Sequence, residues 1–205
     1  MAPYATLRFF LIHWVKRHLA NIEGLEHVPT DQPFIVAANH IDFLDPIYFL
    51  FQLTEKTGRG VTIISKTKNY YWLRSLTLAI DPVERPKVLE RARQYLQQGR
   101  IICIFPEGER NPTGTLLQGK TGVARLALFT RMPVVPLGLR GPAGRSFLDS
   151  VKLLLYNRQP VTVRIGRPMM FPESYDREIT AQLLTEVTKK VMVEIGKLSD
   201  KTYNF

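Results

Sequence analysis

Short apolar runs alternate with amphipathic segments along most of this chain, and no other feature limits its possible folds as strongly. Buried strands appear as short apolar runs, whereas helices that cover a sheet carry apolar residues on one face. We expect strands at residues 34–38, 61–65, 101–105, 134–139 and 161–165, and helices at 46–53, 87–98, 119–130 and 178–198. This order predicts an α/β fold, a mixed and largely buried β-sheet flanked by helices.

The chain of 205 residues contains no internal repeat and no linker, so we expect a single domain. Residues 31–205 should form this domain, and residues 1–30 should precede it as a lead-in with an amphipathic helix. The apolar residues of that helix are interrupted by Arg8, Lys16 and Arg17, so it is too short and too charged for a bilayer span of about 20 apolar residues. Two interpretations remain open, a helix at a membrane interface and a helix packed on the core.

The formal net charge of +10 favours a negatively charged partner, which could be nucleic acid, an anionic membrane or a phosphorylated substrate. The basic residues are spread along the chain, and no zinc-finger, RNA-binding or basic-zipper motif occurs. We therefore rank phosphate and membrane above nucleic acid. Cys103, the single cysteine, lies in an apolar run, which predicts a buried thiol and fits a reducing, cytoplasmic setting. The four histidines show no metal-ligand spacing.

His40 and Asp45 follow directly after the first expected strand, at a position where loops commonly carry catalytic groups. In a helix, five residues would turn the two side chains roughly 140° apart. Pro46, however, disfavours helical geometry at Asp45 and suits the start of a helix, with Asp45 as its N-cap. An irregular turn could then bring Asp45 to His40 and orient a general base. The alternative is an exposed loop histidine beside an unrelated helix cap.

A second group of candidate residues follows the strand expected at 101–105. Gly108 permits close approach of the backbone, and Arg110 offers a fork of donors that matches phosphate. Gly119, Lys120 and Gly122 lie at the expected start of a helix, where free N–H groups and a lysine can hold an anion. Solvated charges and ordinary turn glycines are the alternative interpretation of the same residues.

Taken together, these segments resemble the glycerolipid acyltransferase family, typified by 1-acylglycerol-3-phosphate (lysophosphatidic acid) acyltransferases. Residues 39–45, NHIDFLD, match the family's N-H-x-x-x-x-D block, and residues 105–111, FPEGERN, resemble its F-P-E-G-T-R-S block. Residues 79–85, AIDPVER, look like the arginine-containing block between them, and residues 134–137, VVPL, resemble the V-P-x-x block. Four matches in the family's order are far more specific than any single motif.

The resemblance implies an enzyme of phospholipid biosynthesis that transfers a fatty acyl group from acyl-CoA or acyl-carrier protein to the hydroxyl of a lysophospholipid, with 1-acylglycerol-3-phosphate as the expected acceptor. It implies His40 as the base and Asp45 as the group that orients it. The residues it assigns to acceptor binding and positioning are Arg85, Glu107, Gly108, Arg110 and, as a further candidate, Lys120. No cofactor beyond the acyl donor and no metal are implied. The enzyme would lie on the cytoplasmic face of a membrane, as a peripheral or monotopic protein in contact with anionic lipids.

The sequence departs from the family pattern at Glu109, where a threonine is usual. A carboxylate at this position could pair with Arg110 and weaken phosphate binding. Ala79 and Asp81 also depart from the residues that are common in the middle block. These departures concern the identity of the acceptor rather than the reaction.

Two other functions are compatible with parts of the sequence. Residues 114–121 satisfy the P-loop pattern G-x-x-x-x-G-K-[ST], so a nucleotide-binding protein is one alternative. A P-loop leaves a buried strand directly, whereas the polar turn at residues 108–113 precedes Gly114. A non-catalytic lipid-binding module is the second alternative, and it predicts no loss of function when His40 is changed.

Overall fold

The computed structural model describes residues 20–65, 77–79, 85–144, 146–156 and 161–205. Most of the amphipathic helix expected within residues 1–30 lies outside these ranges. Residues 80–84 of the arginine-containing block also lie outside them.

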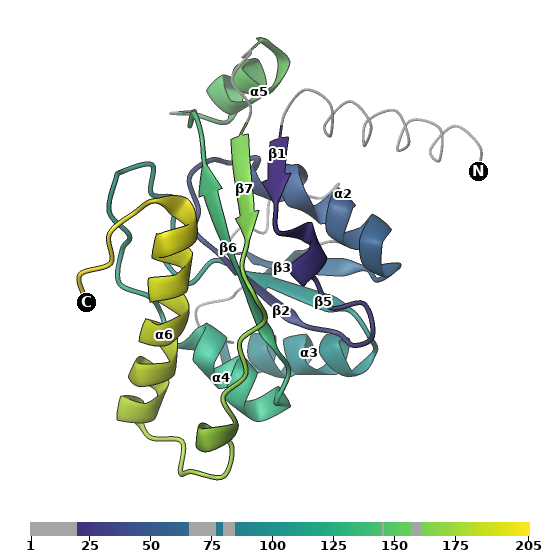
Figure 1. Cartoon of the computed structure of the whole chain (residues 1–205), viewed down its shortest axis with the longest axis vertical. Helices are drawn as coiled ribbons and strands as arrows, with labels where there is room; N and C mark the ends of the chain where they lie inside the picture. Colours follow the sequence, from purple (N-terminus) through teal and green to yellow (C-terminus); the bar gives the residue numbers. More distant parts are fainter. Residues whose placement is uncertain (1–19, 66–76, 80–84, 145, 157–160) are drawn as a thin grey trace.

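A seven-stranded mixed sheet forms the centre of the molecule (Figure 1). Its strands are β1 (Ala20–Glu23), β2 (Ile35–Ala38), β3 (Val61–Ser65), β4 (Thr77–Ala79), β5 (Ile101–Ile104), β6 (Val134–Arg140) and β7 (Val161–Ile165). The strand order is β1-β7-β6-β2-β5-β3-β4, and among these described strands the β6–β7 pair is antiparallel and the other pairs are parallel. All five expected strands are confirmed. β1 and β4 are the additional edge strands, and β1 belongs to the segment that precedes residue 31.

Helices cover both faces of the sheet, as the alternation of segments predicts. They are α2 (Asp45–Thr57), α3 (Arg85–Gln97), α4 (Gly122–Thr130), α5 (Phe147–Tyr156) and α6 (Ala181–Ser199), with short 3-10 turns η1 (Leu25–His27) and η3 (Pro172–Ser174). The helices α3, α4 and α6 pack on one face and α2 on the other, while α5 stands apart beyond the end of β6 (Figure 1). None of the helices in the described ranges is both long and apolar enough to cross a bilayer.

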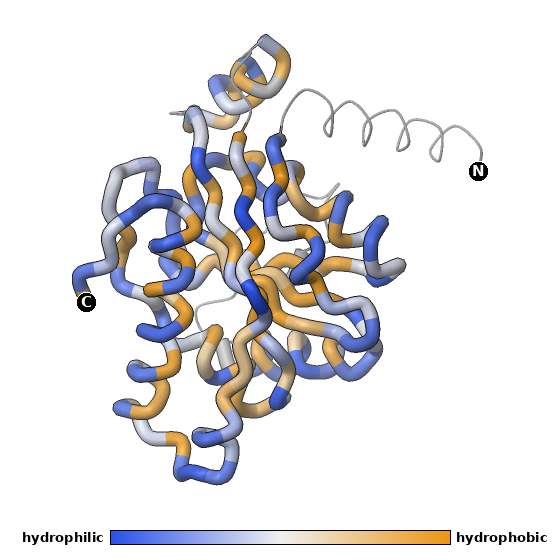
Figure 2. The backbone as a smooth tube through the Cα atoms, viewed as in Figure 1, coloured by the Kyte–Doolittle hydropathy of each residue, from blue (hydrophilic) through white to orange (hydrophobic). Residues whose placement is uncertain are grey.

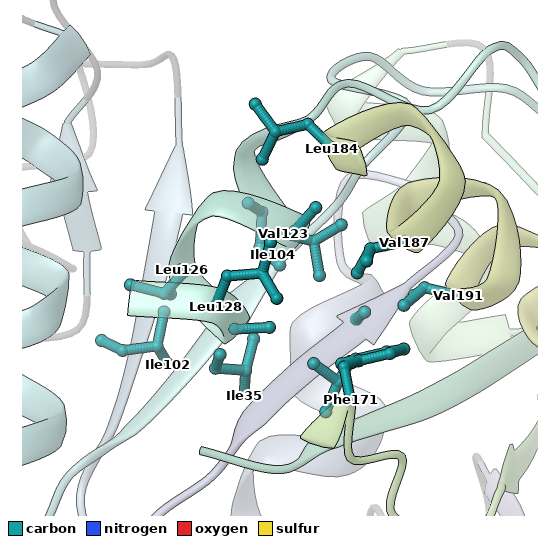
Figure 3. Close-up of a cluster of buried hydrophobic side chains, with 14 of the residues drawn as sticks. Ile35, Ile102, Ile104, Val123, Leu126, Leu128, Phe171, Leu184, Val187 and Val191 are labelled. Carbon is teal, nitrogen blue, oxygen red and sulfur yellow. The ribbon is translucent and has the colours of Figure 1, made fainter. Parts of the chain in front are cut away.

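Alternate residues of β2 point to opposite faces of the sheet, which divides the core into two clusters. Ile35 and Ala37 belong to the cluster under α3, α4 and α6, part of which is drawn in Figure 3. Val36 and Ala38 belong to the cluster under α2. All four residues are completely buried. In Figure 2 the central strands are mostly coloured as hydrophobic, whereas the helices on either side carry both hydrophobic and hydrophilic residues.

All four expected helices start at a different residue from the expected one: α2 at Asp45 instead of 46, α3 at Arg85 instead of 87, α4 at Gly122 instead of 119, and α6 at Ala181 instead of 178. The helix expected at 119–130 begins at Gly122, because the Lys120 N–H donates to the Pro106 carbonyl (2.8 Å) instead of pointing freely from a first helical turn. The N-cap of α2 is Leu44 rather than Asp45, which is the first helical residue and is followed by Pro46. The α5 helix was not expected, and its position is important for the site.

Candidate active site

The candidate site lies at one edge of the sheet. β2, β5 and β6 run parallel to one another, so their carboxyl ends meet at the same edge. Three segments leave from there: the catalytic turn (residues 39–45), the β5 loop (residues 105–121) and the segment 141–146 that leads to α5. The carboxyl edge of a parallel sheet is where α/β proteins generally bind their ligands.

Asn39 fastens the start of the catalytic turn to the neighbouring strand. Its side-chain amide donates to the Leu139 carbonyl (2.9 Å), and its side-chain oxygen accepts the Leu139 N–H (2.7 Å). Asn39 is buried, so these two bonds also satisfy polar groups that are removed from water. The turn therefore leaves the sheet in a fixed direction.

His40 and Asp45 meet, as the irregular turn predicts. The distance from His40 Nδ1 to Asp45 Oδ2 is 2.7 Å, and the same oxygen accepts the N–H groups of Ile41 (2.7 Å) and Asp42 (2.9 Å). Asp45 is fully buried, whereas the His40 side chain is 21% exposed. With Nδ1 donating to Asp45, Nε2 carries the lone pair that can accept a proton. This is the arrangement of an oriented general base.

The surroundings of the pair hold the imidazole ring and affect the carboxyl group. The His40 ring stacks on Phe105, with ring centroids 4.3 Å apart. Burial raises the pKa of the Asp45 carboxyl above its ordinary value, and the hydrogen bonds from His40, Asp42 and Ile41 oppose this rise. Asp45 Oδ1 is buried and has no hydrogen-bond partner among the described residues. The carboxylate is thus directed to His40 through Oδ2 alone.

Glu107 supports the catalytic turn through a hydrogen bond to the backbone of His40. Its Oε1 accepts the His40 N–H (3.3 Å), and its Oε2 accepts the Asn111 side-chain amide (2.8 Å) and the Leu117 N–H (2.9 Å). Glu107 is buried. Because both oxygens bind groups of the protein, Glu107 holds the β5 loop against the catalytic turn.

Gly108 and Lys120 lie against each other. Gly108 has a positive φ of 73°, and a Cβ at this position would clash with the Lys120 amine. The absence of a side chain therefore lets Lys120 cross the β5 loop. The N–H groups of Gly119 and Lys120 are not free for an anion, since they donate to the Tyr203 hydroxyl (3.4 Å) and the Pro106 carbonyl. That part of the anion-site prediction is wrong, whereas the lysine itself remains at the site.

Arg110 lies over an aromatic ring of the catalytic turn. Its guanidinium carbon is 3.3 Å from the centroid of the Phe43 ring, and Nη1 donates to the Gly144 carbonyl (3.4 Å). Glu109 is exposed, and the contacts of Arg110 within the described part of the chain are those to Gly144 and Phe43 rather than an ion pair with Glu109. The guanidinium is therefore not neutralised by its neighbour. The Arg85 backbone opens α3, and its side chain lies outside the described part.

The alternative P-loop is not present in the fold. Residues 114–121 follow the polar turn of the β5 loop, and β5 itself ends at Ile104. Leu116 is buried in the core, and its N–H donates to the Thr202 carbonyl (2.8 Å). A segment whose backbone is bound in this way cannot wrap phosphates.

Three residues without a predicted role complete the site. Asn111 donates its N–H to the His40 carbonyl (2.6 Å), and Lys201 Nζ donates to the Asn111 carbonyl (2.8 Å). Burial lowers the pKa of Lys201, and the carboxylates of Glu107 and Asp45 oppose this effect.

Asp42 connects the catalytic turn to α5 through a hydrogen bond from the Ser150 hydroxyl. Asn111 and Asp42 lie inside two of the motif blocks, at residues 105–111 and 39–45, and could have been noted, but Lys201 is 90 residues from its partner and carries no local signal.

Comparison with known proteins identifies relatives of one kind. A family model described as Acyltransferase matches residues 20–140. A chloroplastic 1-acyl-sn-glycerol-3-phosphate acyltransferase of Arabidopsis thaliana is 36% identical over 132 residues, 59% of this chain and 36% of the relative. The human 1-acyl-sn-glycerol-3-phosphate acyltransferase alpha is 30% identical over 145 residues, 64% of this chain and 50% of the relative. The chain thus spans half or less of the length of these two relatives.

A solved structure shows the same fold. The crystal structure of the 1-acyl-sn-glycerophosphate acyltransferase from Thermotoga maritima aligns with a TM-score of 0.60 at 21% sequence identity. The alignment covers 97% of this chain and 84% of that one. The shared fold therefore also includes described elements beyond residue 140, namely α5, β7 and α6.

Proposed function

Because the chain belongs to the acyltransferase family, we propose that it transfers a fatty acyl group from acyl-CoA or acyl-carrier protein to the free hydroxyl of 1-acylglycerol-3-phosphate. The observation that carries this proposal is the His40–Asp45 pair, held at 2.7 Å at the carboxyl edge of the sheet. The reaction needs no metal and no cofactor beyond the acyl donor. The names of the two curated relatives support the choice of acceptor.

The chemistry follows from the orientation of the imidazole. The acceptor hydroxyl gives its proton to His40 Nε2 while its oxygen attacks the carbonyl carbon of the thioester. The C–S bond then breaks, and the imidazolium returns the proton to the departing thiolate. Asp45 keeps the proton of the neutral ring on Nδ1 and stabilises the imidazolium that forms, as in other oriented histidine bases.

Arg110 is the group best placed to hold the acceptor phosphate. Its planar fork of donors matches a phosphate, and only Gly144 uses one of them among the described residues. Lys120 adds a second positive charge on the same loop. The net charge of +10 supports a location on the cytoplasmic face of an anionic membrane, where the lipid acceptor is found.

The test is thiol release from acyl-CoA, with lysophosphatidic acid first supplied and then omitted. We expect release that depends on the acceptor and that falls by about 10²- to 10⁴-fold in His40→Ala. His27→Gln is the matched control, because His27 lies in η1 and binds the Ile165 carbonyl, away from the site. Cys103 does not interfere with a thiol assay, since burial protects it and raises the pKa of its thiol.

Release that is equal in wild type and His40→Ala would contradict the proposed base and favour a non-catalytic lipid-binding module. Release that occurs with other lysolipids but not with lysophosphatidic acid would keep the reaction and replace the acceptor. The acyl-carrier thioester is assayed in the same way, so that the donor is identified independently.

A further inference from the structure

Helix α5 exposes an apolar surface beside the candidate site. Four of the seven exposed large hydrophobic side chains in the described ranges belong to this ten-residue helix: Phe147, Leu148, Leu155 and Tyr156. Leu148 is 69% exposed and Leu155 is 54% exposed. They are seven residues apart, which is close to two helical turns, so they lie on the same face. Figure 1 shows α5 beyond the end of β6, away from the helices that cover the sheet.

The opposite side of α5 is fixed to the catalytic turn by Asp42. Asp42 Oδ2 accepts the Ser150 hydroxyl (2.7 Å) and the Gly144 N–H (2.7 Å), and Oδ1 accepts the Leu44 N–H (2.9 Å). Asp42 and Ser150 are both buried. Since Ser150 faces inward, Leu148 and Leu155 must face outward. The exposure of the apolar face is therefore a consequence of the tether.

The apolar face is continuous with the candidate site. Phe147 makes an edge contact with Phe43, with ring centroids 6.2 Å apart, and the same Phe43 ring carries the Arg110 guanidinium. The exposed apolar face of α5 is thus connected to the Arg110 guanidinium through the Phe147 and Phe43 rings. Lys152 is exposed between the turns of Leu148 and Leu155 and adds a positive charge to the edge of the face.

The chemistry of this surface favours a lipid over a second copy of the chain. The exposed parts of the four side chains amount to on the order of 500 Å², whereas a stable interface covers about 800 Å² per subunit. Apolar side chains with basic residues beside them are the composition of helices that lie in an anionic membrane interface. The net charge of +10 points to the same partner.

We propose that α5 docks on an anionic lipid surface, with Leu148 and Leu155 inserted among acyl chains and Arg110 facing the headgroup phosphates. The inference rests on the proposed function in one respect, namely that a lipid acceptor brings the site to a lipid surface. Docking through α5 places the catalytic turn near the headgroups, where the acceptor hydroxyl lies. Asp42 sets this depth by holding α5 to the turn that carries His40.

An environment-sensitive fluorophore on Leu148→Cys reports the docking directly, because buried Cys103 is not labelled in the folded chain. We expect a blue shift and protection from iodide on vesicles of phosphatidylglycerol and phosphatidylcholine, and a smaller change on phosphatidylcholine alone. The same label on Phe129→Cys is the matched control. Phe129 is 60% exposed, and its helix α4 lies at the opposite end of the molecule from α5 (Figure 1).

Binding to the same vesicles is then measured by sedimentation for Leu148→Glu/Leu155→Glu and for Phe129→Glu. We expect the double variant to bind at least about tenfold more weakly than wild type, because two inserted leucines are lost. The control variant should bind as wild type does. With a short-chain lysophosphatidic acid that stays monomeric in water, the double variant should turn over as fast as wild type.

A label at residue 148 that stays in water on sedimented, vesicle-bound protein would overturn the proposal. A wild-type dimer in light scattering that becomes monomeric in the double variant would also overturn it, since a second copy would then cover the face. If wild type docks through α5 but transfers no acyl group to any acceptor, the docking stands and the proposed function falls. The two failures are therefore distinguishable.

Discussion

The catalytic turn and helix α5 lie at the same edge of the sheet, yet they are built on opposite principles. In the turn, Asp45 is fully buried, and its Oδ2 accepts three hydrogen bonds. In α5, apolar side chains face water, and the contacts that hold the helix to the catalytic turn include the two bonds that Asp42 accepts from Gly144 and Ser150. The proposed base requires fixed geometry, whereas the proposed lipid contact requires apolar area, and these two requirements fall on separate segments of the chain.

The largest effect on the turn is expected from Asp45→Asn. An amide cannot fix the imidazole tautomer or stabilise the imidazolium, so kcat should fall by about 10²-fold or more while vesicle binding through α5 is unchanged. Acyl transfer to the short-chain acceptor and vesicle sedimentation measure the two properties. Asp31→Asn, at an exposed position, is the control. A parallel loss of vesicle binding would show that the two regions are not separate.

Glu107→Gln tests whether the hydrogen bond from the His40 N–H to Glu107 is needed to position His40. The variant replaces one acceptor oxygen by a donor amide that faces other donors, which should lower the free energy of unfolding by about 1–3 kcal/mol. We expect kcat to fall about tenfold, because the His40 peptide loses a partner. Chemical denaturation and steady-state kinetics provide the two values. Glu109→Gln is the matched control at the exposed neighbouring glutamate, and an equal loss in that variant would remove the special role of Glu107.

Asp42→Asn tests the connection between the two regions. Without the charged acceptor, the Gly144 N–H and the Ser150 hydroxyl are held less tightly, at a cost of about 1–2 kcal/mol. Amide exchange in peptides covering Phe147–Tyr156 should become faster, while turnover of the short-chain acceptor should change only a few-fold. Ser150→Ala, which removes one of the two contacts, should give an intermediate rate of exchange. Unchanged exchange in both variants would mean that α5 is held in another way.

The smallest expected effect is a dependence of the free energy of unfolding on pH, which comes from the Asp45 carboxyl of the catalytic turn. Burial raises the pKa of Asp45 above its ordinary value of 3.8, so the folded chain binds this proton at a higher pH than the unfolded chain does. The contribution of Asp45 to stability is therefore complete below its ordinary pKa and is lost as the pH rises through the raised value. The free energy of unfolding of wild type should fall relative to that of Asp45→Asn over this interval. A difference that is constant with pH would contradict the raised pKa.

Local signals account for what the sequence predicts well. The five apolar runs become strands because short apolar segments suit a sheet that helices cover on both faces. Val88, Ala92 and Leu96 bury one face of α3 because they follow the helical period. The meeting of His40 and Asp45 is also local, since Pro46 and five residues of turn decide it. These features need only the neighbouring residues.

Features that depend on distant partners are not visible in the sequence. β1 contains two polar residues among four, and it becomes a strand because β7 lies beside it. The N–H groups of Gly119 and Lys120 are bound by Tyr203 and Pro106 rather than free, which no pattern at residues 119–122 could indicate. Asp42 reaches Ser150 over 108 residues, and the role of Asp42 depends on where α5 lies.

The contact between Lys201 and Asn111 has a consequence for the order in which the protein is synthesised. Asn111 supports the His40 carbonyl, and Lys201 and Thr202 close over the β5 loop from a position 90 residues later in the chain. At a synthesis rate of about 5–20 residues per second, the loop waits on the order of 5–20 s for its closing segment. A growing chain can therefore expose α5 to a nearby bilayer before its catalytic turn is fully supported. We expect nascent chains stalled before Lys201 to bind vesicles while they remain poor catalysts.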